Sequence, residues 1–354
     1  MDRKNYIIDY DDVILITGAT GFIGSKVVEK LVDYGFRNLR CFMRSASVSG
    51  PLKKTIESSH NANIMIVRGN LLSLEDCERA VDGVKVVYHL AASTQEKSFH
   101  DAYTNSVDTT RNLLDAALKK TKVERFVNVS SFSVYSNMQL PVGALLDESC
   151  PIEAEPELRG EAYSYAKIKQ EELLREYGKK YNIPYVIVRP GAVYGPGSTE
   201  ITGRVGIPRP GLLLHLGGAN IIPFTYVDNC AEAILLAGLK KGIEGEAINV
   251  VDDGVLSSRE FLKMYKRNVG NMRSVYLPKA VSYSVFCLFG TLSRILRGGS
   301  PSRYNHRRWS AYWKGNTYTN EKLKRLLGWV PNVSMEEGMN RYYAYCKRTG
   351  EHDA

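Results

Sequence analysis

Residues 13–24 read Val-Ile-Leu-Ile-Thr-Gly-Ala-Thr-Gly-Phe-Ile-Gly, an apolar run followed by a turn with glycines at 18, 21 and 24. The run predicts a buried strand, and apolar residues at helical spacing after Gly24 predict a helix. A strand, a glycine turn and a helix N-terminus form the first unit of a dinucleotide-binding fold. Gly18 would allow a sharp turn, Gly21 a close approach of backbone to a pyrophosphate, and Gly24 close helix–strand packing. The helix N-terminus would offer N–H groups to the phosphates. A glycine-rich turn without a ligand is the less favoured alternative.

The rest of the chain alternates short apolar runs with helical patterns. The predicted strands lie at 13–16, 39–43, 64–67, 84–90, 126–130, 185–188 and 247–251, and the clearest helices at 105–120, 163–180 and 228–239. This alternation predicts an α/β fold with a doubly wound parallel sheet, the Rossmann fold. We expect a dinucleotide-binding domain over 11–190 plus about 224–251. A smaller, mainly helical substrate-binding lobe is expected from 191–223 plus 252–345, above the carboxyl ends of the strands.

Composition describes a globular chain of 354 residues with 44% hydrophobic and 24% charged residues. The six cysteines are scattered without CxxC pairs or metal-ligand spacing, which favours free thiols in a reducing compartment and no metal site. The N-terminus lacks the basic and apolar parts of a signal peptide, and no apolar stretch reaches ~18 residues. We therefore expect a cytoplasmic protein without a membrane-spanning helix.

Positive charge is concentrated in one segment of the chain, whose net charge is +9. Residues 259–314 hold twelve Lys and Arg against one acid, Glu260. Within this segment an apolar stripe recurs at helical spacing and is accompanied by arginines; the stripe is Val281, Val285, Leu288, Phe289, Leu292 and Ile295, and the arginines are Arg294, Arg297, Arg303, Arg307 and Arg308. A helix packed on the core is the favoured interpretation, and peripheral contact of 281–308 with an anionic membrane is the alternative. No stacking motif is interleaved with the basic residues, so nucleic acid is not an expected partner.

Candidate catalytic residues follow the fifth predicted strand and begin the helix after it. Tyr163 and Lys167, at i and i+4, share one helix face. An ammonium there favours the phenolate and lowers a pKa that is ordinarily ~10, so that the tyrosine can exchange protons near neutrality. Ser131, at the end of the strand, would orient a carbonyl oxygen by a hydrogen bond. Ser130 and Ser133 are nearby alternatives.

The Tyr–x–x–x–Lys spacing alone is weak evidence. It occurs four times, at 163/167, 165/169, 318/322 and 343/347. The last two lie away from the ligand edge of the predicted sheet. We prefer 163/167 to 165/169 because Ala166 leaves room beside the lysine, whereas Ile168 would crowd the other pair.

Several motifs, taken in order, carry a resemblance to a known superfamily. They are TGATGFIG at 17–24, His89-Leu90-Ala91-Ala92, Ser131, Tyr163 with Lys167, Arg189-Pro190-Gly191, Tyr194-Gly195-Pro196 and Leu327-Gly328-Trp329. Over residues 12–345 the chain resembles the extended short-chain dehydrogenase/reductase superfamily of the NAD-dependent epimerase/dehydratase type. It looks most like the 3β-hydroxysteroid dehydrogenase and dihydroflavonol reductase branch.

The resemblance implies a mechanism and an assembly. Tyr163 would be the general acid/base at the substrate oxygen, Lys167 would hold the nicotinamide ribose, and Ser131 would position the carbonyl. Hydride would pass between C4 of the nicotinamide and the substrate carbon. A homodimer through two helices of the main domain is also implied.

The cofactor is expected to be NADP, with NAD as the alternative. Enzymes that use NAD usually place an acid at the end of the second strand, where this chain has Arg44 followed by Ser45 and Ser47. A guanidinium there suits a 2′-phosphate. Asn70 stands where relatives often carry Asp, and its oxygen would accept a hydrogen bond from the adenine amino group. The expected cofactor-binding residues are Gly18, Thr20, Gly21, Phe22, Ile23, Gly24, Arg44, Asn70, Leu71, Ala91, Ala92, Tyr163, Lys167 and Pro190.

Departures from the family pattern bear on the substrate. Asn105 lies one place earlier than an asparagine that relatives use in a proton relay, which puts that relay in doubt. Ala192 and Ile222 stand where nucleotide-sugar enzymes often carry phosphate-binding Asn and Arg. We therefore expect an NAD(P)-dependent oxidoreductase that interconverts a secondary alcohol and a ketone on a bulky, sterol-like or lipid-like substrate. A nucleotide-sugar 4-epimerase or dehydratase with tightly bound NAD is the alternative, and a non-enzymatic NAD(P)-sensing or RNA-binding scaffold is a minor one.

Overall fold

The computed structural model describes residues 6–44, 47–48, 50–92, 96, 98–270, 272–296 and 302–350. Ser45 and Arg297 and the side chain of Arg294, which entered the predictions above, lie outside what it describes.

A seven-stranded, wholly parallel sheet forms the centre of the molecule. Its order is β3 (Asn63–Arg68), β2 (Asn38–Met43), β1 (Val13–Thr17), β4 (Val84–His89), β5 (Arg125–Val129), β7 (Tyr185–Pro190) and β12 (Ala247–Val250). All seven predicted strands are present, and the predicted doubly wound fold is confirmed. The order reverses between β1 and β4, which is where such sheets open a ligand-binding crevice.

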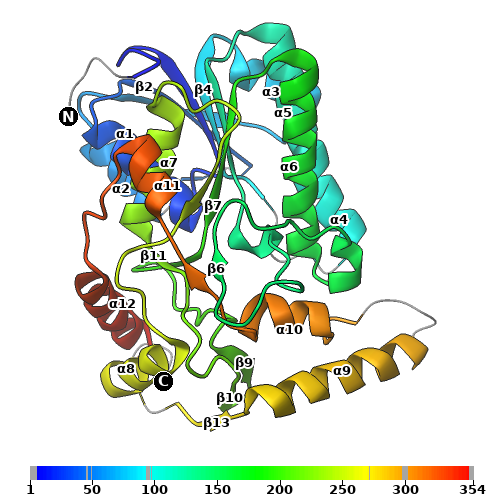
Figure 1. The fold of residues 1–354 in the computed structure, drawn as a ribbon. Coiled ribbons are helices and arrows are strands. Elements are labelled where there is room, and N and C mark those ends of the chain that lie inside the picture. The colour runs from blue at the N-terminus through cyan, green and yellow to red at the C-terminus, as the bar shows by residue number, and fades with distance from the viewer. Residues whose placement is uncertain are drawn as a thin grey trace.

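Helices cover both faces of this sheet (Figure 1). On one face lie α1 (Phe22–Asp33), α2 (Gly50–Ser58), α7 (Val227–Leu239) and α11 (Glu321–Leu327), and on the other α3 (Leu74–Val81), α4 (Phe99–Tyr103), α5 (Thr109–Lys120) and α6 (Ala162–Tyr181). Within β1, Ile14 and Ile16 pack in the core of one face and Leu15 in that of the other. Burial on both sides explains why the strands read as continuous apolar runs.

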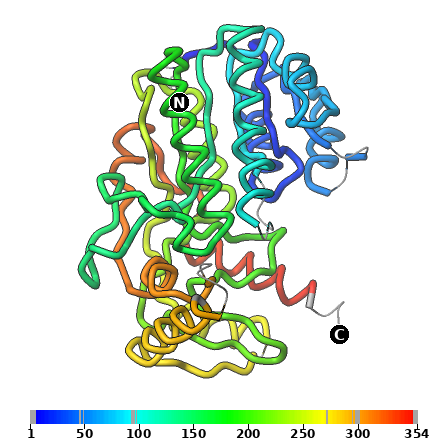
Figure 2. Tube along the Cα trace, turned by 90° about the vertical axis from the view of Figure 1, so that its right-hand side faces the viewer, coloured from blue at the N-terminus to red at the C-terminus, as the bar shows by residue number. Residues whose placement is uncertain are grey.

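The carboxyl ends of the strands point toward a second layer, which lies below the sheet in both views (Figures 1 and 2). Its helices are α8 (Ser258–Asn268), α9 (Lys279–Leu296), α10 (His306–Trp313) and α12 (Met335–Gly350). Its strands are β8 (Ala192–Tyr194) paired with β11 (Phe224–Tyr226), β6 (Leu145–Leu146) paired with β14 (Thr317–Tyr318), and a sheet of β9 (Gly206–Arg209), β10 (Leu212–His215) and β13 (Ser274–Tyr276). The helical C-terminal region was predicted, whereas its strands were not.

Two features of the C-terminal half differ from the expectations. Leu323, Leu327 and Trp329 pack in the sheet core, although 252–345 was assigned to the lobe. The apolar stripe of α9 is exposed, so the favoured interpretation of a stripe packed on the core is wrong. It is the other side of the helix, with Ser282 and Phe286, that is buried. None of the helices described is long and apolar enough to cross a membrane.

We predict that Gly24→Ala lowers the free energy of unfolding by about 1–3 kcal/mol, because overpacking forces backbone shifts. The added Cβ would lie 2.1 Å from the carbonyl oxygen of Gly18. Urea unfolding followed by circular dichroism measures the change. Gly270→Ala is the control, since a Cβ there meets no described atom within 4 Å. Equal stability of the two variants would contradict the prediction.

Candidate active site

A cavity of about 540 Å³ opens at the carboxyl ends of the strands, beside the glycine turn. All of the predicted cofactor-binding residues, from Gly18 to Pro190, line it, and so does Ser131. The cavity is also lined by Leu90, Asn105, Ser130 and Gly191, which were named from the sequence but not counted as cofactor-binding residues, and by residues that the sequence missed, which are Phe42, Met43, Glu96, Thr109, Val129 and Val193. Residues from 18 to 193, about half of the chain, therefore meet in one place.

The glycine turn has the geometry that a pyrophosphate site needs. Gly18 has φ +72°, and a Cβ there would lie 2.9 Å from the amide nitrogen of Ala91. Gly21 precedes α1 and has no side chain to cap the first N–H groups of that helix. These N–H groups are unpaired within the helix and carry the positive end of its dipole. The turn thus fits the phosphates of a dinucleotide, with Gly21 leaving space for them.

Ser131, Tyr163 and Lys167 meet on one wall of the cavity. Ser131 is close enough to Tyr163 to lower the pKa of that tyrosine. The hydroxyl of Ser131 also accepts the N–H of Ser133 at 3.1 Å, which caps the short 3-10 helix Phe132–Val134 and fixes the serine. Lys167 is 4% exposed, and its Nζ donates to the carbonyl oxygen of Val129 at 2.7 Å.

The alternative residues have other partners. Ser130 donates its hydroxyl to Glu171 at 2.6 Å. Lys169 is paired with Glu172, and the ring of Tyr165 packs on Phe99 at a centroid distance of 5.1 Å. Neither Tyr165 nor Lys169 lines the cavity, and the same holds for Ser133. The geometry therefore favours Ser131, Tyr163 and Lys167 as the reacting set.

Burial dominates the titration of this set. It raises the pKa of Tyr163; the neighbouring Ser131 side chain lowers that pKa, and the negative charge of Glu161 raises it. Burial lowers the pKa of Lys167 to about 8, against the opposing charge of Glu171. The lowering of the Tyr163 pKa by Lys167, which the sequence predicted, is not among these causes. The ammonium instead donates to a backbone carbonyl.

A buried ion pair orders the strands beneath the site. Arg189, on β7, donates from Nε to Glu171 of α6 at 2.9 Å. The same guanidinium donates to the hydroxyl of Tyr135 at 2.8 Å, and Tyr135 donates to Asn249 of β12 at 2.7 Å. Because Ser130 also bonds Glu171, this cluster holds the ends of β5, β7 and β12 against the helix that carries Tyr163 and Lys167.

A π-helical turn brings Asn105 to the cavity. The turn spans Thr104–Asp108, between α4 and α5, and holds one residue more than an α-helical turn. Asn105 lines the cavity, and its Nδ2 donates to Glu96 at 2.9 Å. Asn105 lies one place earlier in the sequence than the asparagine of relatives, and at this point the helix has a π-helical turn in place of an α-helical one. That displacement was the one signal by which the sequence could have pointed to Asn105 as a site residue.

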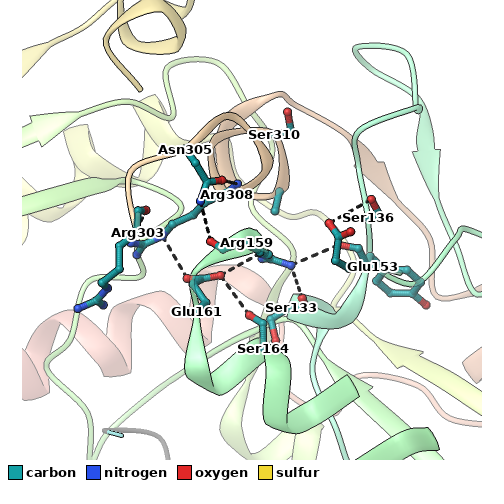
Figure 3. Close-up of polar contacts among 12 residues, drawn as sticks. Ser133, Ser136, Glu153, Arg159, Glu161, Ser164, Arg303, Asn305, Arg308 and Ser310 are labelled. Carbon is teal, nitrogen blue, oxygen red and sulfur yellow. Dashed lines mark hydrogen bonds and ion pairs between the residues drawn. The ribbon is translucent and has the colours of Figure 1, made fainter. Parts of the chain in front are cut away.

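The segment before α6 is tied to the lobe helix α10 (Figure 3). The Glu161 carboxylate forms ion pairs with Arg159, at 2.9 Å, and with Arg308 of α10, at 3.1 Å. Ser164 donates to Glu161 at 3.1 Å. Asn305, which caps α10, donates to the carbonyl oxygen of Arg159 at 3.0 Å. These contacts connect α10 to the first turn of the helix that carries Tyr163.

Two residues at the adenosine end of the cavity bear on the choice of cofactor. Arg44 follows β2 directly and is exposed at the cavity rim. Asn70 follows β3, and its side-chain oxygen already accepts the N–H of Leu72 at 3.1 Å. Since a carbonyl oxygen has two lone pairs, a bond from an adenine amino group stays available to Asn70.

Comparison with known proteins agrees with this arrangement. The model of the NAD dependent epimerase/dehydratase family matches residues 14–250. The 3beta-hydroxysteroid-dehydrogenase/decarboxylase isoform 1 of Arabidopsis thaliana is 27% identical over 92% of this chain and 78% of that protein. The 2-alkyl-3-oxoalkanoate reductase of Stenotrophomonas maltophilia is 27% identical over 94% of this chain and 98% of that protein.

A solved structure shows the same fold. The UDP-glucuronic acid 4-epimerase of Bacillus cereus, in complex with NAD, superposes with a TM-score of 0.70 at 24% identity, over 97% of this chain and 98% of that one. The steroid-dehydrogenase relative agrees with the branch that the motifs indicated. The chain belongs to the NAD dependent epimerase/dehydratase family of the extended short-chain dehydrogenase/reductase superfamily, and it is an oxidoreductase that acts on CH–OH groups.

Proposed function

We propose that this enzyme interconverts a secondary alcohol and a ketone on a bulky, sterol-like or lipid-like substrate. The observation that carries the proposal is the meeting of Ser131, Tyr163 and Lys167 on the wall of a cavity that also holds the glycine turn. Tyr163 gives a proton to the substrate oxygen on reduction and takes it back on oxidation. Ser131 donates a hydrogen bond to the same oxygen, and the Lys167 ammonium holds the ribose hydroxyls of the cofactor. The bound nicotinamide supplies or accepts the hydride.

Two observations support a hydrophobic substrate. Ala192 and Ile222 occupy positions where nucleotide-sugar enzymes often carry phosphate ligands, and Ile222 is fully buried. Two of the relatives are named for a steroid and for an alkyl oxoalkanoate, both rich in hydrocarbon.

A second candidate is a nucleotide-sugar 4-epimerase or dehydratase with tightly bound NAD. It is favoured by three guanidinium groups, those of Arg159, Arg204 and Arg308, which lie 5.5 to 5.7 Å from the ring centroid of Tyr312. Glu161 pairs with two of them, whereas Arg204 bonds neutral partners, the carbonyl of Ala311 and the hydroxyl of Tyr318. This excess of positive charge suits a diphosphate.

The proposal extends to cofactor, location and assembly. NADP is the proposed cofactor, since Arg44 stands at the 2′-phosphate position and no acid does. A cytoplasmic location is supported by six free cysteines. A homodimer through two helices of the main domain rests on the resemblance to the superfamily.

We predict that Tyr163→Phe lowers kcat for ketone reduction by about 10²–10⁴-fold, because the proton donor is lost. Cofactor affinity is expected to change little. The assay follows NADPH consumption with steroid ketones and long-chain oxoalkanoates as substrates. Tyr165→Phe is the matched control on the same helix and keeps its ring contacts. A Tyr163→Phe variant with the kcat of the wild type contradicts the assignment.

The same assay separates the two candidate functions. Protein that is isolated without bound cofactor and reduces hydrophobic ketones agrees with the first. Protein that retains NAD through purification, converts UDP-sugars and reduces no ketone would instead support the nucleotide-sugar enzyme.

We predict that cofactor affinity falls as pH rises through about 8, since Lys167 then loses the proton that gives it its charge. Because burial lowers the pKa of this lysine, its side chain is fully protonated only below that pH. Loss of a charged hydrogen bond corresponds to about 10- to 100-fold in Kd. Calorimetric titration between pH 6 and pH 9.5, roughly spanning this pKa, measures the change. Lys167→Met should bind weakly at every pH, and Lys169→Met, the control, should follow the wild type. An unchanged Kd across this range in the wild type would refute the assignment.

We predict that wild-type protein binds NADPH more tightly than NADH by about 10- to 100-fold. This is the gain in affinity, about 10- to 100-fold, expected from a charged, bidentate hydrogen bond between Arg44 and the 2′-phosphate. Arg44→Ala should abolish this difference and leave NADH binding unchanged. Arg68→Ala, at the exposed end of the neighbouring strand, is the control. A preference for NADH in the wild type would overturn the choice of cofactor.

A further inference from the structure

Helix α9 presents an apolar face to solvent, and we call this surface the α9 face. It consists of Val281, Val285, Leu288, Phe289, Leu292, Ile295 and Leu296, each at least 40% exposed. Leu288 is 60%, Ile295 71% and Leu296 84% exposed. Side chains of this kind on one helix amount to a large contiguous apolar patch, which is unusual on a protein that stays in water.

The opposite side of α9 explains why the apolar side faces outward. Ser282 accepts the indole N–H of Trp309 at 3.0 Å, and Phe286 packs against Trp313 at a centroid distance of 5.2 Å. A Cβ on Gly290 would lie 2.9 Å from the carbonyl oxygen of Tyr304, so this side of the helix approaches the chain closely. The helix is therefore held mainly by its small and aromatic residues, and its aliphatic residues are 40% or more exposed.

The position of α9 makes this face accessible. In both views the helix lies along the edge of the molecule that is farthest from α3 and α5, beside β9, β10 and β13 (Figures 1 and 2). Val275 and Tyr276 of β13 add exposed apolar surface, at 49% and 44%.

The sequence around α9 is rich in positive charge: residues 201–227 and 261–320 contain thirteen Lys and Arg and no Asp or Glu. Two of these cations are paired with acids from elsewhere in the chain, Arg307 with Glu153 and Glu155, and Arg308 with Glu161. Exposed cations at this end include Arg209, Arg273 and Arg303. Arg209, which is exposed, lines an apolar cavity of about 210 Å³ beside α9 together with Phe289 and Tyr304.

We propose that the α9 face docks this enzyme on an anionic lipid bilayer, with its aliphatic side chains among the acyl chains and Arg209 and Arg303 at the lipid phosphates. An amphipathic helix lies in the interface plane when apolar burial and attraction to anionic lipid act together. A second copy of the chain is a less suitable occupant, because a two-fold contact would bring two basic surfaces together. Docking requires neither cofactor nor substrate, so its failure is distinguishable from failure of the proposed chemistry.

The test is sedimentation of the full chain with vesicles of phosphatidylglycerol and phosphatidylcholine in equal parts, and with vesicles of phosphatidylcholine alone. Strong binding to the mixed vesicles at low salt, weakened by added salt, is expected. Leu288→Ser combined with Ile295→Ser should lower the partition coefficient by about tenfold or more. Leu118→Ser combined with Val330→Ser, which removes exposed apolar side chains elsewhere, should leave it unchanged.

The electrostatic part has its own variant. Arg209→Gln combined with Arg303→Gln should lower binding to the mixed vesicles by about fivefold per residue and reduce its salt dependence. Wild-type protein that stays in the supernatant with mixed vesicles at low salt overturns the proposal. A second result would also overturn it. If light scattering without vesicles shows that the wild type is a dimer and that the variant with Leu288→Ser and Ile295→Ser is a monomer, then a second copy of the chain covers this face.

Discussion

A buried ion pair between Arg189 and Glu171 holds the parts of this site in register. Arg189 is the penultimate residue of strand β7, and Glu171 lies one helical turn after Lys167. Removing one partner of such a pair leaves an uncompensated buried charge and costs about 3–5 kcal/mol. The hydroxyl of Ser130 adds the end of β5 to the same cluster. The lysine that faces the cofactor cavity is thereby fixed relative to the strands that shape that cavity.

The lobe acts on the same helix from its other end. Glu161 precedes the first turn of α6 and is paired with Arg308 of α10, so helix and lobe share one buried carboxylate. The exposed α9 packs on α10 through Trp309 and Trp313. A continuous set of contacts thus leads from the α9 face through α10 to Tyr163. The proposed docking surface is therefore connected, through α10, to the first turn of the helix that carries Tyr163 and Lys167.

The chemistry of the site depends on burial as much as on residue type. Lys167 has its pKa lowered to about 8 because it is removed from water, and the neighbouring carboxylate of Glu171 limits this effect. Burial also keeps His89 neutral, with a pKa lowered to about 3, between the hydroxyls of Thr17 and Thr110. A neutral imidazole in this place joins β1, β4 and α5 without adding charge beneath the cofactor cavity.

The sequence by itself determined the seven strands, the glycine turn and the family, because buried parallel strands and phosphate-binding turns require particular residues at short, fixed spacing. It also pointed to Ser131, Tyr163 and Lys167, which the structure brings to one cavity wall. Only the tertiary structure decided which side of α9 is buried, since aliphatic spacing specifies a helix face but not its partner; contacts with Trp309 and Trp313 made that choice. Likewise, the place of Asn105 depends on a π-helical turn, and the pKa of Lys167 on burial by distant segments, and neither is encoded in local spacing.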